Sequence, residues 1–259
     1  MRIVTWNLNH GHGSVAWPRL QALLGAEIVL LQETRRPDWP GGLLWASVPH
    51  HDRGSAVLAT KGTFREMPVR GYRGWVVGGE LVDSGMNADG RPLFVFSVHA
   101  PTSHATRLRR PYVQEVMKIL ELLGRQIPND TDLILGGDFN LRSLGERSAT
   151  ECFKTSAVER KCLARFAGLG LVSCWAAAHP GHPLPQTLRW TGDRTPDKST
   201  PYHCDGIFVP ASWKQGIICE VLTSAYFEVS DHNPVVAWIA RRMDADATAP
   251  GRDAAVTAG

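Results

Sequence analysis

The 259-residue sequence lacks several features that would place it in a specialised class of proteins. Its five cysteines are odd in number and show no close metal-type pairing, so reduced and mostly buried thiols are expected. No apolar run approaches the ~20 residues that a membrane-spanning helix needs. The chain opens with a predicted strand instead of a secretory signal. We therefore expect a cytoplasmic protein with no membrane partner.

The sequence also has little net charge. A formal charge of +3 and a pI near 8.7 are compatible with a polyanionic partner but do not argue for one. A hydrophobic share of 43% and nine tryptophans predict a folded protein with a substantial core. No linker or repeat divides the chain, so we predict a single domain over residues 1–243. Residues 244–259 have almost no bulky apolar side chain, which predicts a disordered tail.

Strands interleaved with a few helices are predicted along the chain. Arg2–Asn7 is rich in β-branched and aromatic residues, and Glu27–Glu33 reads as a strand covered on both faces. Further strands are predicted at 54–60, 75–82, 92–100, 132–140, 171–175, 187–190, 202–209, 216–223 and 233–240, with 75–82 and 92–100 as antiparallel neighbours. Helices are predicted at 17–25, at 106–127 and around 159–168.

Polar side chains stand at the ends of several of these strands, where a core would exclude them. They are Asn7, Asn9, Glu33, His99, Asp138, Asn140, Asp205, and the pair Asp231 and His232 before the last strand. Buried carboxylates are costly unless they are paired or bind a metal ion. Each segment alone is also typical of a turn, a solvated edge or a loop cap. Their combined order along the chain favours a functional site.

The segments TWNLN, LLQE, GGDFN, CDGIFV and SDHNPV together resemble the endonuclease/exonuclease/phosphatase superfamily, over roughly residues 1–240. Its members include abasic-site endonucleases, pancreatic-type deoxyribonuclease, sphingomyelinases, deadenylases and inositol polyphosphate 5-phosphatases. GDFN and SDHNP are the most specific of these segments. The resemblance implies an α/β (α+β) fold: a four-layer sandwich of two packed, mostly antiparallel β-sheets flanked by helices, with the site at one end.

The resemblance also implies metal-dependent hydrolysis of a phosphoester by water. The implied metal ligands are Glu33, Asn7 and Asp231. The implied cofactor is Mg²⁺, with Mn²⁺ as a substitute. The implied catalytic residues are Asp138, Asn140, His232, Asp205 and His99. In this family pattern Asp205 holds the His232 imidazole as a cation facing the phosphate, and the general base is either Asp138 or His232.

His99 stands where the abasic-endonuclease branch carries a tyrosine and several other branches a histidine, so the chain departs from the abasic-endonuclease pattern. We expect a phosphodiesterase acting on nucleic acid, as an endo- or exonuclease. Arginines near the site segments favour it, although such charges are also typical of a solvated face; they are Arg35, Arg36, Arg107, Arg109, Arg110, Arg189 and Arg194. A phosphomonoesterase or an inositol- or lipid-phosphate hydrolase is the alternative. The intact set of acids argues against a non-catalytic binding module, and no obligate protein partner is indicated.

Overall fold

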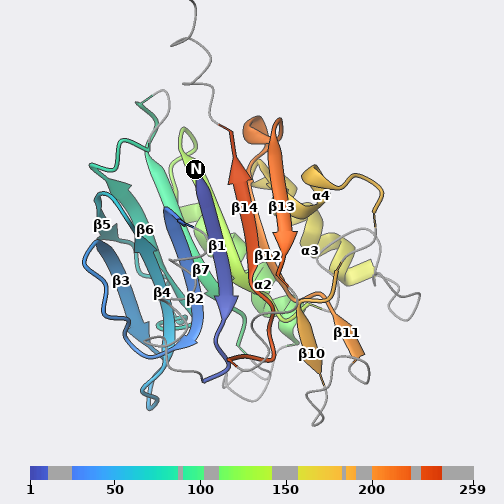
Figure 1. The fold of residues 1–259 in the computed structure, drawn as a ribbon, viewed down its shortest axis with the longest axis horizontal. Coiled ribbons are helices and arrows are strands. Elements are labelled where there is room, and N and C mark those ends of the chain that lie inside the picture. The colour runs from blue at the N-terminus through green and yellow to red at the C-terminus, as the bar shows by residue number, and fades with distance from the viewer. Residues whose placement is uncertain are drawn as a thin grey trace, which may run out of the picture.

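Two six-stranded β-sheets dominate the protein and pack against each other (Figure 1). The structure is a computed structural model, and it describes residues 1–10, 25–86, 90–101, 111–141, 157–182, 185–190, 200–222 and 229–240. Several predicted features lie outside these residues: most of the helix at 17–25, the start of the helix at 106–127 with Arg107, Arg109 and Arg110, Cys152, Arg194 and the tail at 244–259.

The first sheet has the strand order β13-β14-β1-β2-β4-β3. Its strands are β1 (Arg2–Asn7), β2 (Ile28–Thr34), β3 (Gly42–Ser47), β4 (Gly54–Ala59), β13 (Ile217–Val221) and β14 (Val235–Ile239). The second sheet has the order β5-β6-β7-β8-β12-β9. Its strands are β5 (Thr63–Glu66), β6 (Val76–Val82), β7 (Leu93–His99), β8 (Asp132–Asp138), β9 (Leu171–Ser173) and β12 (Asp205–Pro210). A separate ribbon consists of β10 (Leu188–Trp190) and β11 (Thr200–Tyr202).

Each sheet has a parallel pair at its centre and antiparallel pairs around it. Strands β1 and β2 run parallel in the first sheet, and β7 and β8 run parallel in the second. Strand β14 is antiparallel to β1, and β12 is antiparallel to β8. In each sheet, the carboxyl ends of the two parallel strands therefore lie next to the start of the neighbouring antiparallel strand, which is β14 in the first sheet and β12 in the second. This arrangement is the predicted sandwich of mostly antiparallel sheets, and it gathers four strand ends and two strand starts at one end of the molecule.

The space between the sheets is filled by apolar side chains from both. Ile3 and Leu30 of the first sheet and Val95 and Ile134 of the second are among the fully buried residues of this cluster. Burying one such aliphatic side chain stabilises the fold by about 1.5–3 kcal/mol relative to exposure. The central strands are covered on both faces, which explains why their sequences are continuously apolar instead of alternating. The core thus holds the two sheets, and the polar residues at their ends, in a fixed relation.

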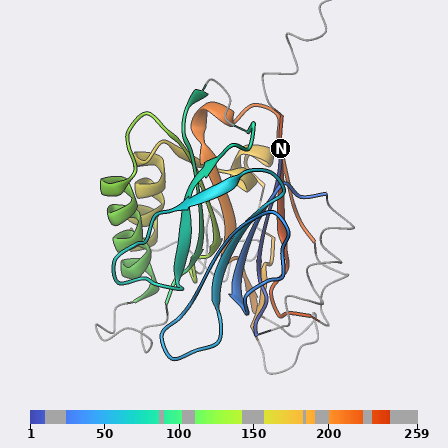
Figure 2. The same ribbon diagram turned by 90° about the vertical axis from the view of Figure 1, so that its left-hand side faces the viewer.

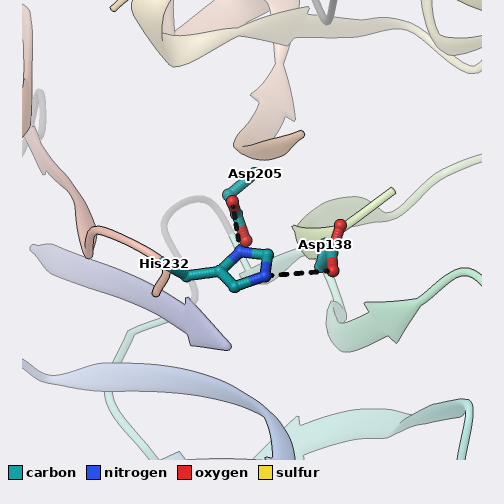
Figure 3. A group of neighbouring side chains, drawn as sticks. All are labelled: Asp138, Asp205 and His232. Carbon is teal, nitrogen blue, oxygen red and sulfur yellow. Dashed lines mark hydrogen bonds and ion pairs between the residues drawn. The ribbon is translucent and has the colours of Figure 1, made fainter. Parts of the chain in front are cut away.

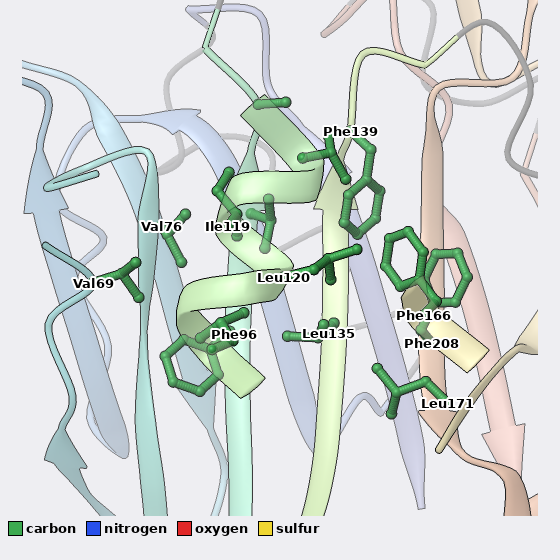
Figure 4. Close-up of a cluster of buried hydrophobic side chains, with 14 of the residues drawn as sticks. Val69, Val76, Phe96, Ile119, Leu120, Leu135, Phe139, Phe166, Leu171 and Phe208 are labelled. Atoms are coloured by element: carbon green, nitrogen blue, oxygen red, sulfur yellow. The ribbon is translucent and has the colours of Figure 1, made fainter. Parts of the chain in front are cut away.

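Two helices cover the outer face of the second sheet, α2 (Tyr112–Gln126) and α3 (Ala157–Gly168) (Figure 2). In α2 the buried apolar residues recur with helical spacing at Val116, Ile119, Leu120 and Leu123. They pack against apolar residues of the second sheet, and Phe139, Phe166 and Phe208 form an aromatic group beside them (Figure 4). Because Phe139 directly follows Asp138, this packing anchors the segment that carries the carboxylate.

Most predicted elements are confirmed, but two predicted strands differ from the structure and two observed strands were not predicted. The predicted strand at 171–175 ends at Ser173, because Ser173 caps the short helix α4 (Cys174–Ala178) by accepting a hydrogen bond from the backbone N–H of Ala176. The predicted strand at 202–209 is divided between β11 and β12. Strands β3 and β5 were not predicted; β3 is half-buried and β5 is a short, largely exposed strand at a sheet edge. The predicted antiparallel pairing of 75–82 with 92–100 is confirmed by β6 and β7.

The state of the cysteines and the length of the helices bear on two further predictions. Cys162, Cys174, Cys204 and Cys219 are free and buried, as predicted. No helix within the described ranges combines the length and the apolar character needed to cross a bilayer.

Candidate active site at the rim of the two sheets

A cleft of about 400 Å³ opens at the end of the sandwich where the parallel strands terminate. Residues from both sheets line it, and six of them were predicted as site residues: Glu33, His99, Asp138, Asn140, Asp231 and His232. The other two predicted residues, Asn7 and Asp205, are fully buried beneath it and contact these side chains. The structure therefore brings together all eight residues that the sequence selected.

Asp138 is the last residue of β8 and is almost fully buried, at 2% exposure. Its Oδ1 accepts a hydrogen bond from the backbone N–H of Asn140 at 2.8 Å, and its Oδ2 accepts one from Asn7 Nδ2 at 3.0 Å. Burial, followed by the nearby charge of Asp205, raises the pKa of Asp138 to about 6, although His232 and His99 oppose the shift. This carboxyl group can therefore exchange a proton close to neutral pH.

Glycine before Asp138 is required by the close approach of β8 to β7. A Cβ atom at Gly137, whose φ is +152°, would lie 1.8 Å from the carbonyl oxygen of Val98. Only glycine lets the two strands keep the register that pairs His99 with Asp138. The second glycine of the GGD sequence thus has a direct role in placing two site residues opposite each other.

His232 and Asp205 form a buried pair beside Asp138 (Figure 3). His232 Nδ1 lies 2.9 Å from Asp205 Oδ2, and His232 Nε2 lies 3.8 Å from Asp138 Oδ2. Burial alone would lower the pKa of His232, but the charge and hydrogen bond of Asp205, with help from Asp138 and Asp231, raise it to about 10. At neutral pH the imidazole is a cation that directs Nε2–H toward the cleft.

The segment that carries His232 is fixed by hydrogen bonds to both neighbouring regions. Trp6 Nε1 donates to the carbonyl oxygen of His232 at 2.9 Å. The hydroxyl of Ser230 donates to the carbonyl oxygen of Asn7 and accepts from the backbone N–H of His232. The buried Arg189 guanidinium donates to Asn233 Oδ1 and to the Ser230 carbonyl. Arg189, which the sequence suggested as a phosphate-attracting charge, is thus a clamp on this loop.

Glu33 lies on the other side of Asn7, at the end of β2. Its backbone has a φ of +51°, next to a register shift between Leu31 and Thr34 where β2 pairs with β4. Glu33 Oε1 accepts a hydrogen bond from Asn7 Nδ2 at 3.1 Å and lies 3.5 Å from His99 Nε2. Burial would raise the pKa of Glu33, but His99, the Asn7 hydrogen bond, His10 and His232 together lower it. This carboxylate therefore stays ionised at neutral pH.

The remaining predicted residues occupy the space around these carboxylates. His99 Nε2 lies between the two, 3.9 Å from Asp138 Oδ2, and its ring contacts Trp75 with centroids 5.0 Å apart. Asn140 has a φ of +50°, and its Nδ2 donates to the carbonyl oxygen of Ala100. Asp231 Oδ1 lies 3.9 Å from His232 Nε2. Asp231 is thus found on the His232 side of the cleft.

The comparison with known families agrees with this geometry. Residues 4–232 match the model of the Endonuclease/Exonuclease/phosphatase family. The chain belongs to this family. The family name covers nucleases and phosphatases, so membership supports a hydrolase of phosphoester bonds. A search of curated proteins gave no match.

Solved structures with the family fold are similar over almost the whole chain. An AP endonuclease from Archaeoglobus fulgidus has a TM-score of 0.67 at 14% identity, with 92% of this chain and 99% of that chain covered. A variant of the 3' phosphatase NExo from Neisseria, bound to a product DNA hairpin, has a TM-score of 0.68 at 19% identity, covering 93% and 100%. The endonuclease domain of TRAS1, a telomere-specific non-LTR retrotransposon, has a TM-score of 0.65 at 16% identity, covering 93% and 99%. At these identities the likeness shows the shared fold.

The cleft and the buried residues beneath it offer two places where a divalent cation could bind. Asp138, Asp205 and His232 present ligand atoms within 4.8 Å of one another. Without an ion, however, Asp205 outweighs the effect of burial and raises the pKa of His232 to about 10, so a cation at this place would have to displace a proton from the imidazole. Glu33 is ionised and its carboxylate faces the cleft, so it fits a hard cation better. Asp231 Oδ1 and Asp205 Oδ1 are both buried without a hydrogen-bond partner among the described residues, so an oxygen that could bind a cation or accept from a substrate is found at each place.

Several cleft residues were not predicted from the sequence, among them His10, Arg53, Trp75 and Tyr112. Burial and the nearby Asp138 raise the pKa of Tyr112, so its phenol stays protonated as a donor. His10 follows the TWNLN segment directly, and this adjacency is a signal that the sequence did contain. Trp75 and Arg53 lie in loops without a motif, and only the fold places them at the cleft. His203 lies two residues before Asp205 but has a structural contact instead. It is buried with its Nδ1 2.7 Å from the Pro185 carbonyl, and burial lowers its pKa to about 4.

Proposed function

We propose that the protein is a Mg²⁺-dependent phosphodiesterase that hydrolyses nucleic acid by the attack of water on a bound phosphoryl group. The observation that carries this proposal is the joining of Glu33, Asp138 and the Asp205–His232 pair in one cleft by strands of both sheets. An ionised carboxylate, a carboxyl group that exchanges protons near neutral pH and a cationic imidazole are the groups that water attack on an anionic phosphate requires.

We assign Glu33 as the main metal ligand, with Asp231 as a further carboxylate of the metal site. A bound Mg²⁺ would neutralise phosphoryl charge and polarise the phosphoryl oxygens. Asn7 acts through its neighbours: its Nδ2 donates to Glu33 and to Asp138, while its Oδ1 accepts from the backbone N–H of Asn9 at 2.9 Å. In this orientation Asn7 fixes the direction of both carboxylates. The sequence-based assignment of Asn7 as a ligand thus becomes a proposal that it positions Glu33.

Of the two candidates for the general base, the contacts favour Asp138. His232 is protonated at neutral pH because Asp205 holds its Nδ1–H, so its remaining Nε2–H can only donate to a phosphoryl oxygen. Asp138, with a pKa of about 6, can accept a proton from water at neutral pH. Asn140, Tyr112 and His99 line the same space and supply further hydrogen-bond donors toward the phosphoryl group.

Nucleic acid is our preferred substrate class. The solved structures with this fold are described as an AP endonuclease, a phosphatase bound to a DNA hairpin and a retrotransposon endonuclease. Cleft residues His10, His51 and Arg53 add basic groups at the open side of the site. A phosphomonoesterase with the same residues is the second candidate, favoured by His99, which offers an imidazole to a terminal phosphate between Glu33 and Asp138. A cytoplasmic location and the lack of an obligate protein partner remain predictions from the sequence.

A substrate screen with and without the metal tests this proposal. The protein would be incubated with Mg²⁺ or with EDTA and plasmid, single-stranded DNA, RNA, abasic duplex, 3'-phosphorylated DNA, sugar phosphates and inositol phosphates. We expect cleavage of nucleic acid that needs Mg²⁺ and is lost in the Asp138→Asn protein. Release of inorganic phosphate alone would favour the phosphomonoesterase. Hydrolysis that continues in EDTA or in Asp138→Asn would refute the proposed site.

A further inference from the structure

The Glu33 carboxylate has an imidazole on each of its two oxygens. Oε1 lies 3.5 Å from His99 Nε2, and Oε2 lies 3.1 Å from His10 Nε2. His10 is 58% exposed and lines the cleft, so its ring meets Glu33 at the open side of the site. The function proposed above uses His10 only as a basic group at the open side of the site, although its contact with Glu33 is shorter than that of His99.

The backbone places His10 in this position by local geometry that few residues adopt. Asn9 and His10 have φ values of +40° and +66°, in the left-handed region that L residues rarely occupy. The turn is held by a hydrogen bond from the backbone N–H of Asn9 to Asn7 Oδ1 and by another from the backbone N–H of Leu8 to the Gln32 carbonyl. Glu33 itself has a φ of +51°. Strained residues in the turn after β1 and at the end of β2 therefore direct an imidazole and a carboxylate toward each other.

The distance between these two atoms fits a shared metal ion. Two ligands at right angles on an ion about 2.1 Å away are about 3 Å apart, and His10 Nε2 is 3.1 Å from Glu33 Oε2. An imidazole nitrogen is a poor ligand for Mg²⁺ and a good one for first-row transition ions. A site that combines carboxylate and imidazole therefore differs in its metal preference from a site made only of oxygen.

We propose that His10 is a nitrogen ligand of the cation that Glu33 binds, and that it shifts the preference of the site from Mg²⁺ toward Mn²⁺ and other first-row ions. This inference rests on the proposed function only in that Glu33 holds the ion. It adds a ligand and a metal selectivity to that site.

Electron spin echo spectroscopy of bound Mn²⁺ tests the inference without measuring activity. Modulation from imidazole nitrogen appears only when an imidazole is bound to the ion. We would compare the wild type with His10→Asn, since asparagine tolerates the left-handed backbone. His50→Asn is the matched control, because His50 has nearly the same φ of +65°, is exposed and is not among the lining residues of the cleft. Competition titrations would give the ratio of Mn²⁺ to Mg²⁺ affinity for each protein.

We expect imidazole modulation in the wild type and in His50→Asn and its loss in His10→Asn. The Mn²⁺-to-Mg²⁺ preference should fall about tenfold in His10→Asn and stay unchanged in His50→Asn. Mn²⁺ bound without imidazole modulation in the wild type would overturn the inference and leave Glu33 as a ligand, and so would modulation that persists in His10→Asn. Failure of the wild type to bind Mn²⁺ or Mg²⁺ at all would overturn both this inference and the proposed metal site.

Discussion

Glu33 and Asp138 occupy matching places in the two sheets but meet opposite environments. Each stands at the carboxyl end of a strand from the central parallel pair, Glu33 in the first sheet and Asp138 in the second. Asn7 Nδ2 donates to both. Glu33 is partly exposed among imidazoles, which lower its pKa, while burial and Asp205 raise the pKa of Asp138 to about 6.

The difference shows how one cleft can give two carboxyl groups opposite pKa shifts, and so suit them to different roles. When neighbouring carboxyl groups have pKa values pushed apart, the environment has assigned them different roles. The group with the lowered pKa remains an anion and suits a metal ion. The group with the raised pKa, Asp138, can take up a proton near pH 6, which suits the role of proton acceptor that we propose for it. The predictions that follow separate these two roles experimentally.

The largest expected effect comes from removing the proton acceptor. Asp138→Asn keeps the shape of the side chain but cannot accept a proton from water. We expect the rate of Mg²⁺-dependent hydrolysis to fall by about 10²–10⁴-fold, measured as kcat/KM on the best substrate of the screen. Metal affinity, measured by calorimetry, should change little. A large loss of metal affinity in this variant would show that Asp138 shares the task of Glu33.

The next effect concerns the cation beside Asp138. Asp205→Asn removes the charge that holds His232 protonated, so the pKa of His232 should fall from about 10 by about 1–3 units. Titration of the His232 ring by NMR measures this change, and the alkaline limb of the pH–rate profile should move in the same direction. An unaltered His232 titration would mean that Asp205 does not set its charge.

Glu33→Gln should affect the metal instead of the proton. The neutral amide keeps the size of the side chain but loses the anionic ligand, so metal affinity should fall about 10–100-fold. Raising the Mg²⁺ concentration should restore a large part of the activity, which it should not do for Asp138→Asn. Equal Mg²⁺ titrations for the wild type and Glu33→Gln would contradict the assignment of Glu33.

The smallest expected effect is on stability. The pKa of Asp138 is about 6 in the folded protein and 3.8 for the ordinary side chain. A raised folded pKa favours folding below the ordinary pKa, and this contribution is lost as the pH rises through 6. The ionised Asp138 therefore destabilises the fold at pH 8, whereas asparagine carries no such cost. Asp138→Asn should gain on the order of 1 kcal/mol in unfolding free energy relative to the wild type on going from pH 5 to pH 8. Urea unfolding at both pH values measures it, and a difference that is independent of pH would contradict the raised pKa.

The sequence predicted the members of the site through the combined order of polar residues at the ends of apolar strands and the family resemblance of these segments, since each segment alone is also typical of a turn or a loop cap. Glu33, Asp138, Asp205 and His232 could each be selected in this way, and a sandwich fold accounts for their meeting. Their detailed relations could not be predicted. The orientation of Asn7 depends on the parallel pairing of β1 with β2, and the approach of His10 depends on left-handed backbone at two residues. Neither feature has a pattern in the local sequence.

Other differences arise where tertiary contacts override a local pattern. The 202–209 segment was predicted as one strand, yet Thr187 Oγ1 accepts hydrogen bonds from the backbone N–H groups of Cys204 and Asp205. These contacts come from a residue distant in the sequence, and they separate β11 from β12 just where Asp205 enters the site. Strand β5 escaped prediction because its short, exposed sequence TFRE lacks a core-facing pattern. The Arg189 clamp likewise depends on a loop that follows it by some forty residues.

The amide of Asn7 tethers the two sheets at the cleft, since it bridges Glu33 and Asp138. Deeper between the sheets, the Ser97 hydroxyl of β7 donates to the Leu31 carbonyl of β2. Beyond such side-chain bonds, the alignment of the two carboxylates depends on packing between the layers, which tolerates small sliding displacements more readily than the backbone ladders do. Low urea concentrations or hydrostatic pressure should therefore abolish hydrolysis of the substrate under conditions where circular dichroism still reports intact sheets. We therefore expect turnover to report the alignment of the two layers more sensitively than any spectroscopic measure of their secondary structure.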